Sequence, residues 1–200
     1  MIDVSGLKGR IGEAFVENIL RRAGYRVARV GRESQIHRLV KIGTDEFLPD
    51  FLIWKPAEHG PAGERLHRLM TVEVKYRANI PEWLRWFDRE RLAAVAGQWP
   101  EHYLVFVTDN PQDRRSCFQV IDLRDYAPGR ALVTKDLHEA RELDIFQKTV
   151  EEYESLVKRM FSLLSVHGTV EDLEPKAELK LNGRLPPAEP EPVAPVIPGA

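Results

Sequence analysis

Apolar and polar positions change period along the first 165 residues, from helical spacing to alternation and back. Residues 5–24 carry an apolar stripe at helical spacing, and Gly24 at their end is a common helix stop. Polar and apolar residues then alternate over Tyr25–Val30, as they do in a half-buried strand. Residues 32–46 fit either a short helix or a strand. The chain is therefore predicted to begin with a helix and a strand.

The apolar runs farther along predict two paired strands, a helix and two more strands. Leu48–Trp54 and Met70–Tyr76 are the paired strands, and a segment rich in Pro, Gly and His separates them. The later elements are, in order, a helix over residues 81–98, strands at His102–Thr108 and Ser116–Leu123, and a helix over residues 144–165. We expect an α/β fold with a central mixed β-sheet flanked by helices. The extra C-terminal helix is expected to pack on the sheet or on a second subunit.

Composition divides the 200 residues into a folded part and a tail. Residues 1–143 are long enough for one domain with its own core, and residues 144–165 add one helix. Residues 166–200 hold seven of the fourteen prolines and six acidic residues but no aromatic residue. Such a composition buries too little apolar surface to fold, so we expect a disordered, acidic, Pro-rich tail.

The net charge of the whole chain indicates no particular partner, but the charged residues are unevenly distributed along the sequence. The 29 Lys and Arg residues against 31 Asp and Glu residues give a formal net charge of −2. Residues 1–41, however, carry nine basic residues against four acidic ones. This segment can face phosphates, or it can simply form a solvated helix face.

Cysteine usage and hydropathy indicate the compartment. Cys117 is the single cysteine and lies in an apolar strand, so we expect a core residue rather than a catalytic thiol. No signal peptide is expected at the start of the chain, and no apolar run approaches the ~18 residues of a membrane span. The expected setting is a reducing cytoplasm, without a membrane partner.

The two paired strands carry the chemistry around which the chain is organised. Glu73 and Lys75 lie on the same side of their strand, roughly 6.6 Å apart, because strand side chains alternate faces. Asp50, at the start of the preceding strand, can then stand beside Glu73. Two carboxylates about 4 Å apart repel by about 4 kcal/mol at an effective dielectric of about 20, so the pair needs a proton or a cation. A divalent cation held by carboxylates commonly serves phosphate chemistry.

Motifs for rival chemistry are absent from the sequence. It contains no phosphate-binding G-x-x-x-x-G-K-[ST], no G-x-G-x-x-G, no H-E-x-x-H and no paired Cys/His cluster. The six histidines are scattered along the chain. We therefore expect no small-molecule cofactor.

In the order helix, strand and strand, Glu13, Pro49-Asp50 and Glu73-Val74-Lys75 resemble the pattern of the PD-(D/E)xK nuclease superfamily. The layout of residues 5–125 looks most like Holliday-junction resolvases and restriction-type endonucleases. The resemblance implies a restriction-endonuclease-like core and a metal-dependent DNA endonuclease that hydrolyses phosphodiester bonds. It also implies DNA as the partner and structure-selective or restriction-type action. A homodimer is one assembly that the C-terminal helix and the aromatic residues described below would allow.

The same resemblance implies a role for each motif residue. Asp50 and Glu73 bind Mg²⁺, for which Mn²⁺ can substitute, and the main-chain carbonyl of Val74 is a further ligand. Lys75 orients or deprotonates the attacking water. Glu13 completes the acidic cluster, directly or through a water molecule.

Other interpretations of these residues remain open. Gln98 only loosely matches a position where some members place a polar active-site residue. Glu73 and Lys75 can form an ion pair on an exposed sheet face, and Asp50 can cap a turn. Glu13 can be a solvated residue of an amphipathic helix. The alternative function is a catalytically inactive module of the same fold that binds DNA or a protein partner.

Basic and aromatic residues supply candidate DNA contacts. Phosphate contacts would position DNA without reading its sequence. Trp83, Trp86 and Phe87 either stack on unpaired bases, form a dimer seam or belong to the core. The candidate phosphate contacts are Lys8, Arg10, Arg21, Arg22, Arg29, Arg32, Arg38 and Lys41.

Overall fold

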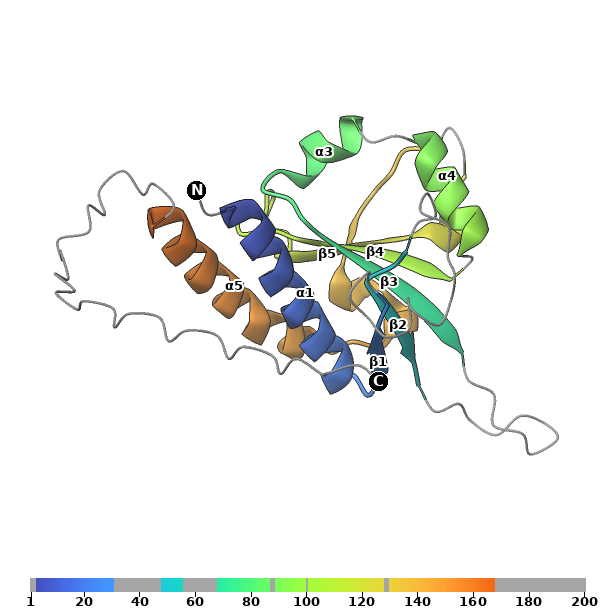
Figure 1. Cartoon of the computed structure of the whole chain (residues 1–200), viewed down its shortest axis with the longest axis horizontal. Helices are drawn as coiled ribbons and strands as arrows, with labels where there is room; N and C mark the ends of the chain where they lie inside the picture. Colours follow the sequence, from blue (N-terminus) through green and yellow to red (C-terminus); the bar gives the residue numbers. More distant parts are fainter. Residues whose placement is uncertain are drawn as a thin grey trace, which may run out of the picture. The chain divides into compact units, whose positions relative to one another are not determined.

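The computed structural model describes residues 3–30, 48–55, 68–86, 89–99, 101–127 and 130–167. They form a six-stranded mixed sheet with helices on both faces (Figure 1). The expected α/β architecture, a mixed sheet flanked by helices with an extra C-terminal helix, is confirmed.

The strands of the sheet lie in chain order. Every neighbouring pair is antiparallel except β3 with β4, which are parallel. A parallel pair needs a long connection, and the two helices that follow β3 provide it. The strands are β1 (Arg26–Arg29), β2 (Phe51–Trp54), β3 (Leu69–Tyr76), β4 (His102–Val107), β5 (Phe118–Asp122) and β6 (Lys135–Asp136).

Helices cover both faces of the sheet. On one face α1 (Val4–Arg22) and α5 (Gln147–His167) lie side by side (Figure 1). On the other face lie α3 (Ile80–Trp86) and α4 (Arg89–Gln98). Short 3-10 helices follow β5 and β6: η1 (Leu123–Asp125), η2 (Leu137–Glu139) and η3 (Arg141–Leu143).

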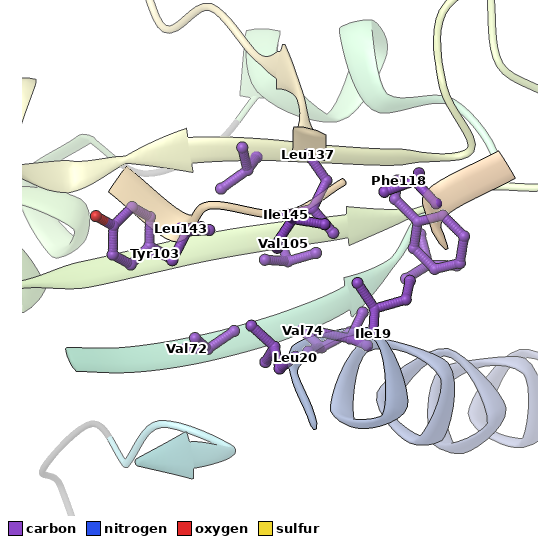
Figure 2. Close-up of a cluster of buried hydrophobic side chains, with 14 of the residues drawn as sticks. Ile19, Leu20, Val72, Val74, Tyr103, Val105, Phe118, Leu137, Leu143 and Ile145 are labelled. Carbon is purple, nitrogen blue, oxygen red and sulfur yellow. The ribbon is translucent and has the colours of Figure 1, made fainter. Parts of the chain in front are cut away.

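Alternate residues of the central strands enter two separate cores. Val74 of β3 and Val105 of β4 belong to the core beneath α1, where they meet Ile19 (Figure 2). Phe106 points to the opposite face and packs with Leu92 of α4. Burying side chains of this size contributes roughly 1.5–3 kcal/mol each. The period-2 pattern of the strands therefore sets which residues can face a site between the layers.

Local sequence signals set the ends of α1. The Asp3 side chain accepts a hydrogen bond from the N–H of Gly6 at 2.9 Å and caps the helix. Gly24 follows the helix with a φ of 87°, a conformation that favours glycine. The helix expected over residues 5–24 is confirmed.

Some elements differ from expectation. The single helix expected over residues 81–98 is two helices, α3 and α4 (Figure 1). β6 and the 3-10 helices were not predicted, because segments of two or three residues are too short to show a period. α5 continues to His167, slightly beyond its expected end. Residues 32–46 and 168–200 lie outside the described residues, so the disordered tail remains a prediction.

The structure also bears on the cysteine and on membrane-spanning segments. Cys117 is fully buried in the core, as expected. No described helix combines the length and hydropathy required to cross a membrane.

Candidate metal centre

β2 and β3 separate at Pro49. Their register pairs Phe51 with Val72, so Pro49 would lie opposite Val74 if the pairing continued. Proline has no N–H to contribute to a strand pair, and β2 begins only at Phe51. Because the β2–β3 pairing ends at Phe51 and Val72, the backbone N–H of Val74 has no main-chain acceptor on β2 and takes a side-chain acceptor instead.

Asp50 supplies that acceptor. Its Oδ2 accepts a hydrogen bond from the N–H of Val74 at 2.7 Å. Its main-chain carbonyl accepts a hydrogen bond from the N–H of Val30 at 2.9 Å, just beyond the end of β1. Asp50 is thus held by both neighbouring strands, and its carboxylate bridges to β3 rather than capping a local turn.

Glu73 is a buried acid with one unpartnered oxygen. It shares the face of β3 opposite Val72 and Val74 with Lys75. Its Oε1 accepts a hydrogen bond from Lys75 Nζ in an ion pair, while its Oε2 has no hydrogen-bond partner among the described residues. The Glu73 side chain is only 6% exposed, against 37% for Lys75. The pair therefore differs from an ion pair on an exposed sheet face.

Electrostatics disfavour two bare charges on Asp50 and Glu73. Burial and then the charge of Asp50 raise the pKa of Glu73 from 4.5 to about 7, against the opposing effect of Lys75. Burial also raises the pKa of Asp50, although the Val74 N–H and the charge of Lys75 oppose the rise. Neighbouring carboxylates of this kind retain a proton or take up a cation.

Glu13, on α1, lies near the same two acids. We call Glu13, Asp50, Glu73 and Lys75 together the acidic corner. Burial, and then the charge of Asp50, raises the pKa of Glu13, while Arg29 and Lys75 oppose the rise. Arg29 of β1 lies 3.9 Å from the Glu13 carboxylate and 2.5 Å from that of Glu17. The structure thus brings three acids and one lysine together from α1, β3 and the segment before β2.

His102 is a neighbour of this corner that the sequence analysis did not single out. It lies at the start of β4, and its Nδ1 is 2.8 Å from Thr71 Oγ1. Burial, and then the charge of Lys75, lowers the pKa of His102 to about 4, so the ring is neutral at pH 7. The sequence did contain a signal for His102, because it is a histidine in an otherwise apolar strand. The sequence analysis looked for paired Cys and His ligands and therefore did not select a single histidine.

The oxygens at this corner are of the type that a divalent cation takes, although those of Glu13, Asp50 and Glu73 do not all lie within 4.8 Å of one another in the described structure. Glu73 Oε2 is buried without a hydrogen bond in the described structure, and further carboxylates lie beside it. Mg²⁺ and similar hard cations prefer carboxylate and carbonyl oxygens, and their charge reverses the local penalty for ionising the acids. The groups available to hold such an ion are the carboxylates of Glu13, Asp50 and Glu73 and the main-chain carbonyl of Val74.

Two other residues from the sequence analysis have different surroundings. Gln98 is exposed at the end of α4, and within the described residues its side chain has no hydrogen bond to the three acids. Lys8 is buried, with its Nζ 2.7 Å from Asp109 Oδ2 and 2.9 Å from Ser165 Oγ. The expected phosphate contact of Lys8 is therefore corrected, because this lysine joins α1 to α5 and to the segment after β4.

The remaining basic residues of the N-terminal segment are exposed where they are described. Arg21 pairs with Glu17, and Arg22 pairs with Glu152 of α5. Arg10 is also exposed, and its charge opposes the rise in the pKa of the nearby Glu13. Three further candidates lie outside the described residues: Arg32, Arg38 and Lys41.

The two tryptophans of α3 have different environments. Trp83 is half-buried, with its ring 5.1 Å from that of Phe106 and 5.1 Å from the guanidinium of Arg77. Trp86, in contrast, is 84% exposed. Phe87 lies outside the described residues. Trp83 therefore belongs to the core, whereas Trp86 is available for contact with a partner.

In a second group of candidate ligands the two carboxylates are committed to local structure, while the Nδ1 atom of the histidine, His138, is buried without a hydrogen-bond partner among the described residues. Asp136, His138 and Glu139 place ligand atoms within 4.8 Å of one another. Arg115 donates to Asp136 at 2.7 Å, and Glu139 accepts from the N–H of Asp136 at 3.0 Å in a capping box for η2.

A cavity of about 210 Å³ lies beside β5. None of the predicted site residues lines it.

No protein-family model matches the chain, and no curated protein has a significant sequence match. Among solved structures, the chain is similar to Hjc, a Holliday junction resolvase from the archaeal hyperthermophile Archaeoglobus fulgidus. The similarity covers 74% of this chain and 99% of the resolvase, at 14% identity and a TM-score of 0.33. Agreement at this level carries no argument about function, which has to be made from the residues themselves.

Proposed function

We propose that this protein is a metal-dependent DNA endonuclease of the PD-(D/E)xK type, with structure-selective or restriction-type action. The observation that carries the proposal is the buried carboxylate of Glu73. One of its oxygens is bound to Lys75, and the other is buried without a donor in the described structure, beside the Asp50 carboxylate, with which it can share only a proton or a cation. An unsatisfied buried acceptor costs about 1–3 kcal/mol, and a bound cation would remove that cost.

Each residue of the centre has a distinct task in this proposal. Asp50, Glu73 and Glu13 would hold Mg²⁺ or Mn²⁺ together with the main-chain carbonyl of Val74. When bound, the metal supplies charge neutralisation at the phosphate and acidifies a water molecule. Lys75 is more than a third exposed, so its amine is accessible to orient the attacking water and to add positive charge near the phosphate.

Exposed basic and aromatic residues support DNA as the substrate. Arg10 is exposed on α1 close to Glu13. Arg85 and Arg89 are exposed on either side of the exposed Trp86. Arginines of this kind contact phosphates, and an exposed indole can stack on an unpaired base. We assign these four residues to DNA binding, in a protein that acts in the reducing cytoplasm.

One observation favours the alternative, a catalytically inactive module of the same fold that binds DNA or a protein partner. Lys75 is bound directly to Glu73, and a lysine engaged in this way can serve packing alone. The two functions differ in their response to metal, because an inactive module can bind DNA without cleaving it.

Labelled linear, flapped and four-way DNA, incubated with Mg²⁺ or Mn²⁺, test the proposal. We expect metal-dependent cleavage that falls about 100-fold or more in Asp50→Asn and in Lys75→Ala, because each change removes charge stabilisation from the transition state. Glu82→Gln, an exposed acid on α3, is the matched control and should cleave normally. If the wild-type protein binds these DNAs but leaves every one intact, the inactive module is the correct function.

A further inference from the structure

The outward side of α5 carries exposed apolar side chains. Four of the seven large hydrophobic side chains that are exposed in the described part of the chain lie on α5 or at its start. Phe146 is 70% exposed and Leu163 is 54% exposed, although Val150 and Val157 on the inner side of the helix are fully buried. Together with the half-buried Thr149 and Tyr153, the four exposed residues form what we call the α5 stripe: Phe146, Thr149, Tyr153, Leu156, Met160 and Leu163.

The α5 stripe has the spacing of a coiled-coil seam. Its members follow one another at intervals of three, four, three, four and three residues. This spacing keeps the side chains on one line along a helix, where they can interlock with a second helix. Within the stripe Tyr153 also packs against the core beneath α5, whereas the fully buried residues of the helix, Val150, Val157 and Phe161, are a different set.

Charges beside the stripe favour an antiparallel arrangement of two copies. Glu152 and Arg159 are exposed and lie seven residues apart, along the same edge of the stripe. If Tyr153 packs against the partner's Leu156, each Arg159 lies beside the partner's Glu152, and the contact occurs twice. A parallel arrangement would instead bring like charges to the same level. Glu152 Oε2 already binds Arg22 at 2.5 Å, which leaves Oε1 for a contact with the partner's Arg159.

We propose that the α5 stripe is covered by the same stripe of a second copy of this chain, in a two-fold symmetric dimer with antiparallel α5 helices. A two-fold axis requires a self-complementary surface, in which residue i contacts residue j and j contacts i. The spacing and the charge order of α5 meet this requirement. The proposal is independent of whether the protein cleaves DNA.

Pairing through the α5 stripe leaves the acidic corner uncovered, because α1 lies between them. The ring of Phe15 on α1 packs against Tyr153 at 5.7 Å. A different side of α1 carries Glu17, which binds Arg29 of β1 at 2.5 Å. A dimer built in this way therefore presents two acidic corners, one from each copy.

Sedimentation velocity of the full chain over a range of concentrations tests the interface. We expect a monomer–dimer equilibrium whose Kd rises at least about 30-fold in Leu156→Glu, the change produced by losing an interface hot spot. Val133→Glu is the matched control, because Val133 is an exposed apolar residue beside β5 and is not part of the α5 stripe. Circular dichroism melts show whether each variant is folded.

Charge reversal tests the antiparallel register. Glu152→Arg and Arg159→Glu should each be monomeric, because each homodimer then faces like charges at both contacts. An equimolar mixture should form dimers again, since only the mixed pair matches both contacts.

Three results would overturn the proposal. They are a wild-type protein that is monomeric at every concentration, a dimer unaffected by Leu156→Glu, and a mixture that associates no better than its components. If the protein is monomeric and Leu156→Glu lowers its melting temperature, the α5 stripe is covered by another segment of the same chain.

Discussion

Glu73 and Asp50 are two acids that the fold holds close together away from water. Folded Glu73 has a pKa of about 7, whereas an unfolded glutamate releases its proton near 4.5. Between these values the folded state binds more protons than the unfolded state, so the stability of the metal-free protein falls as pH rises. A carboxylate stabilised by an ion pair has the opposite effect, because its contribution to stability increases as pH rises.

Glu73→Gln should remove this pH dependence. The glutamine keeps the shape of the side chain and carries no charge to bury, so the variant should be more stable than wild type at pH 8. Thermal melts from pH 5 to pH 8 in the presence of a chelator measure the difference. Equal losses of stability in both proteins with rising pH would show that Glu73 does not dominate the effect.

Metal should stabilise the wild-type protein more at high pH. Because a cation at this corner competes with protons on Glu73 and Asp50, the rise in Tm on adding Mg²⁺ or Mn²⁺ should be larger at pH 8 than at pH 6. Glu73→Gln lacks one ligand and should show a much smaller rise. The same rise in both proteins would place the bound metal elsewhere.

Among the elements, α1 contributes to both the acidic corner and the packing against α5. One side of it supplies Glu13, and its first turns supply the buried Lys8. The Nζ of Lys8 contacts Asp109 after β4 and Ser165 on α5, so one cation connects three segments that are distant in the sequence. Breaking such a pair leaves the remaining partner poorly solvated.

Lys8→Met should therefore destabilise the fold without weakening DNA binding. Loss of one partner of a buried ion pair costs about 3 kcal/mol, at the lower end of the usual range because Asp109 is partly exposed. Urea denaturation of Lys8→Met, Asp109→Asn and the double variant measures the coupling, and the double variant should lose less than the sum of the single changes. A variant that stays as stable as wild type but binds DNA more weakly would restore Lys8 as a phosphate contact.

For the whole molecule, the formal net charge of −2 gives no general attraction for DNA. Binding must then come from local surfaces, such as the exposed arginines on either side of Trp86. Phosphate contacts weaken with salt, whereas stacking depends mainly on unpaired bases. The two contributions can therefore be separated by experiment.

Trp86→Ala should weaken binding to flapped or single-stranded DNA by about 1–3 kcal/mol and leave duplex binding nearly unchanged. Arg85→Gln with Arg89→Gln should weaken binding to all DNAs and reduce the slope of log K against log salt. Fluorescence anisotropy at several salt concentrations measures both effects, with Val133→Ala as the control. A loss of duplex and single-stranded binding to the same degree in Trp86→Ala would rule out base stacking by this residue.

The sequence by itself determined most of the longer elements and the shared face of Glu73 and Lys75. These follow from local periodicity, because side-chain direction in a strand or helix depends only on the spacing of neighbouring residues. The strand expected from Leu48, in contrast, begins only at Phe51, because Pro49 has no N–H to contribute to strand pairing. Elements of two or three residues, such as β6, carried too little pattern to be predicted.

Only the tertiary structure decided which distant groups meet. It placed the Asp50 carboxylate on the Val74 N–H, Glu13 at the same corner, and Lys8 in the interior. The sequence pattern cannot fix such contacts, because burial and electrostatic environment depend on the packing of elements far apart in the chain. The composition gives the number of charged residues in this protein, but three-dimensional packing determines which of them are buried, paired or exposed.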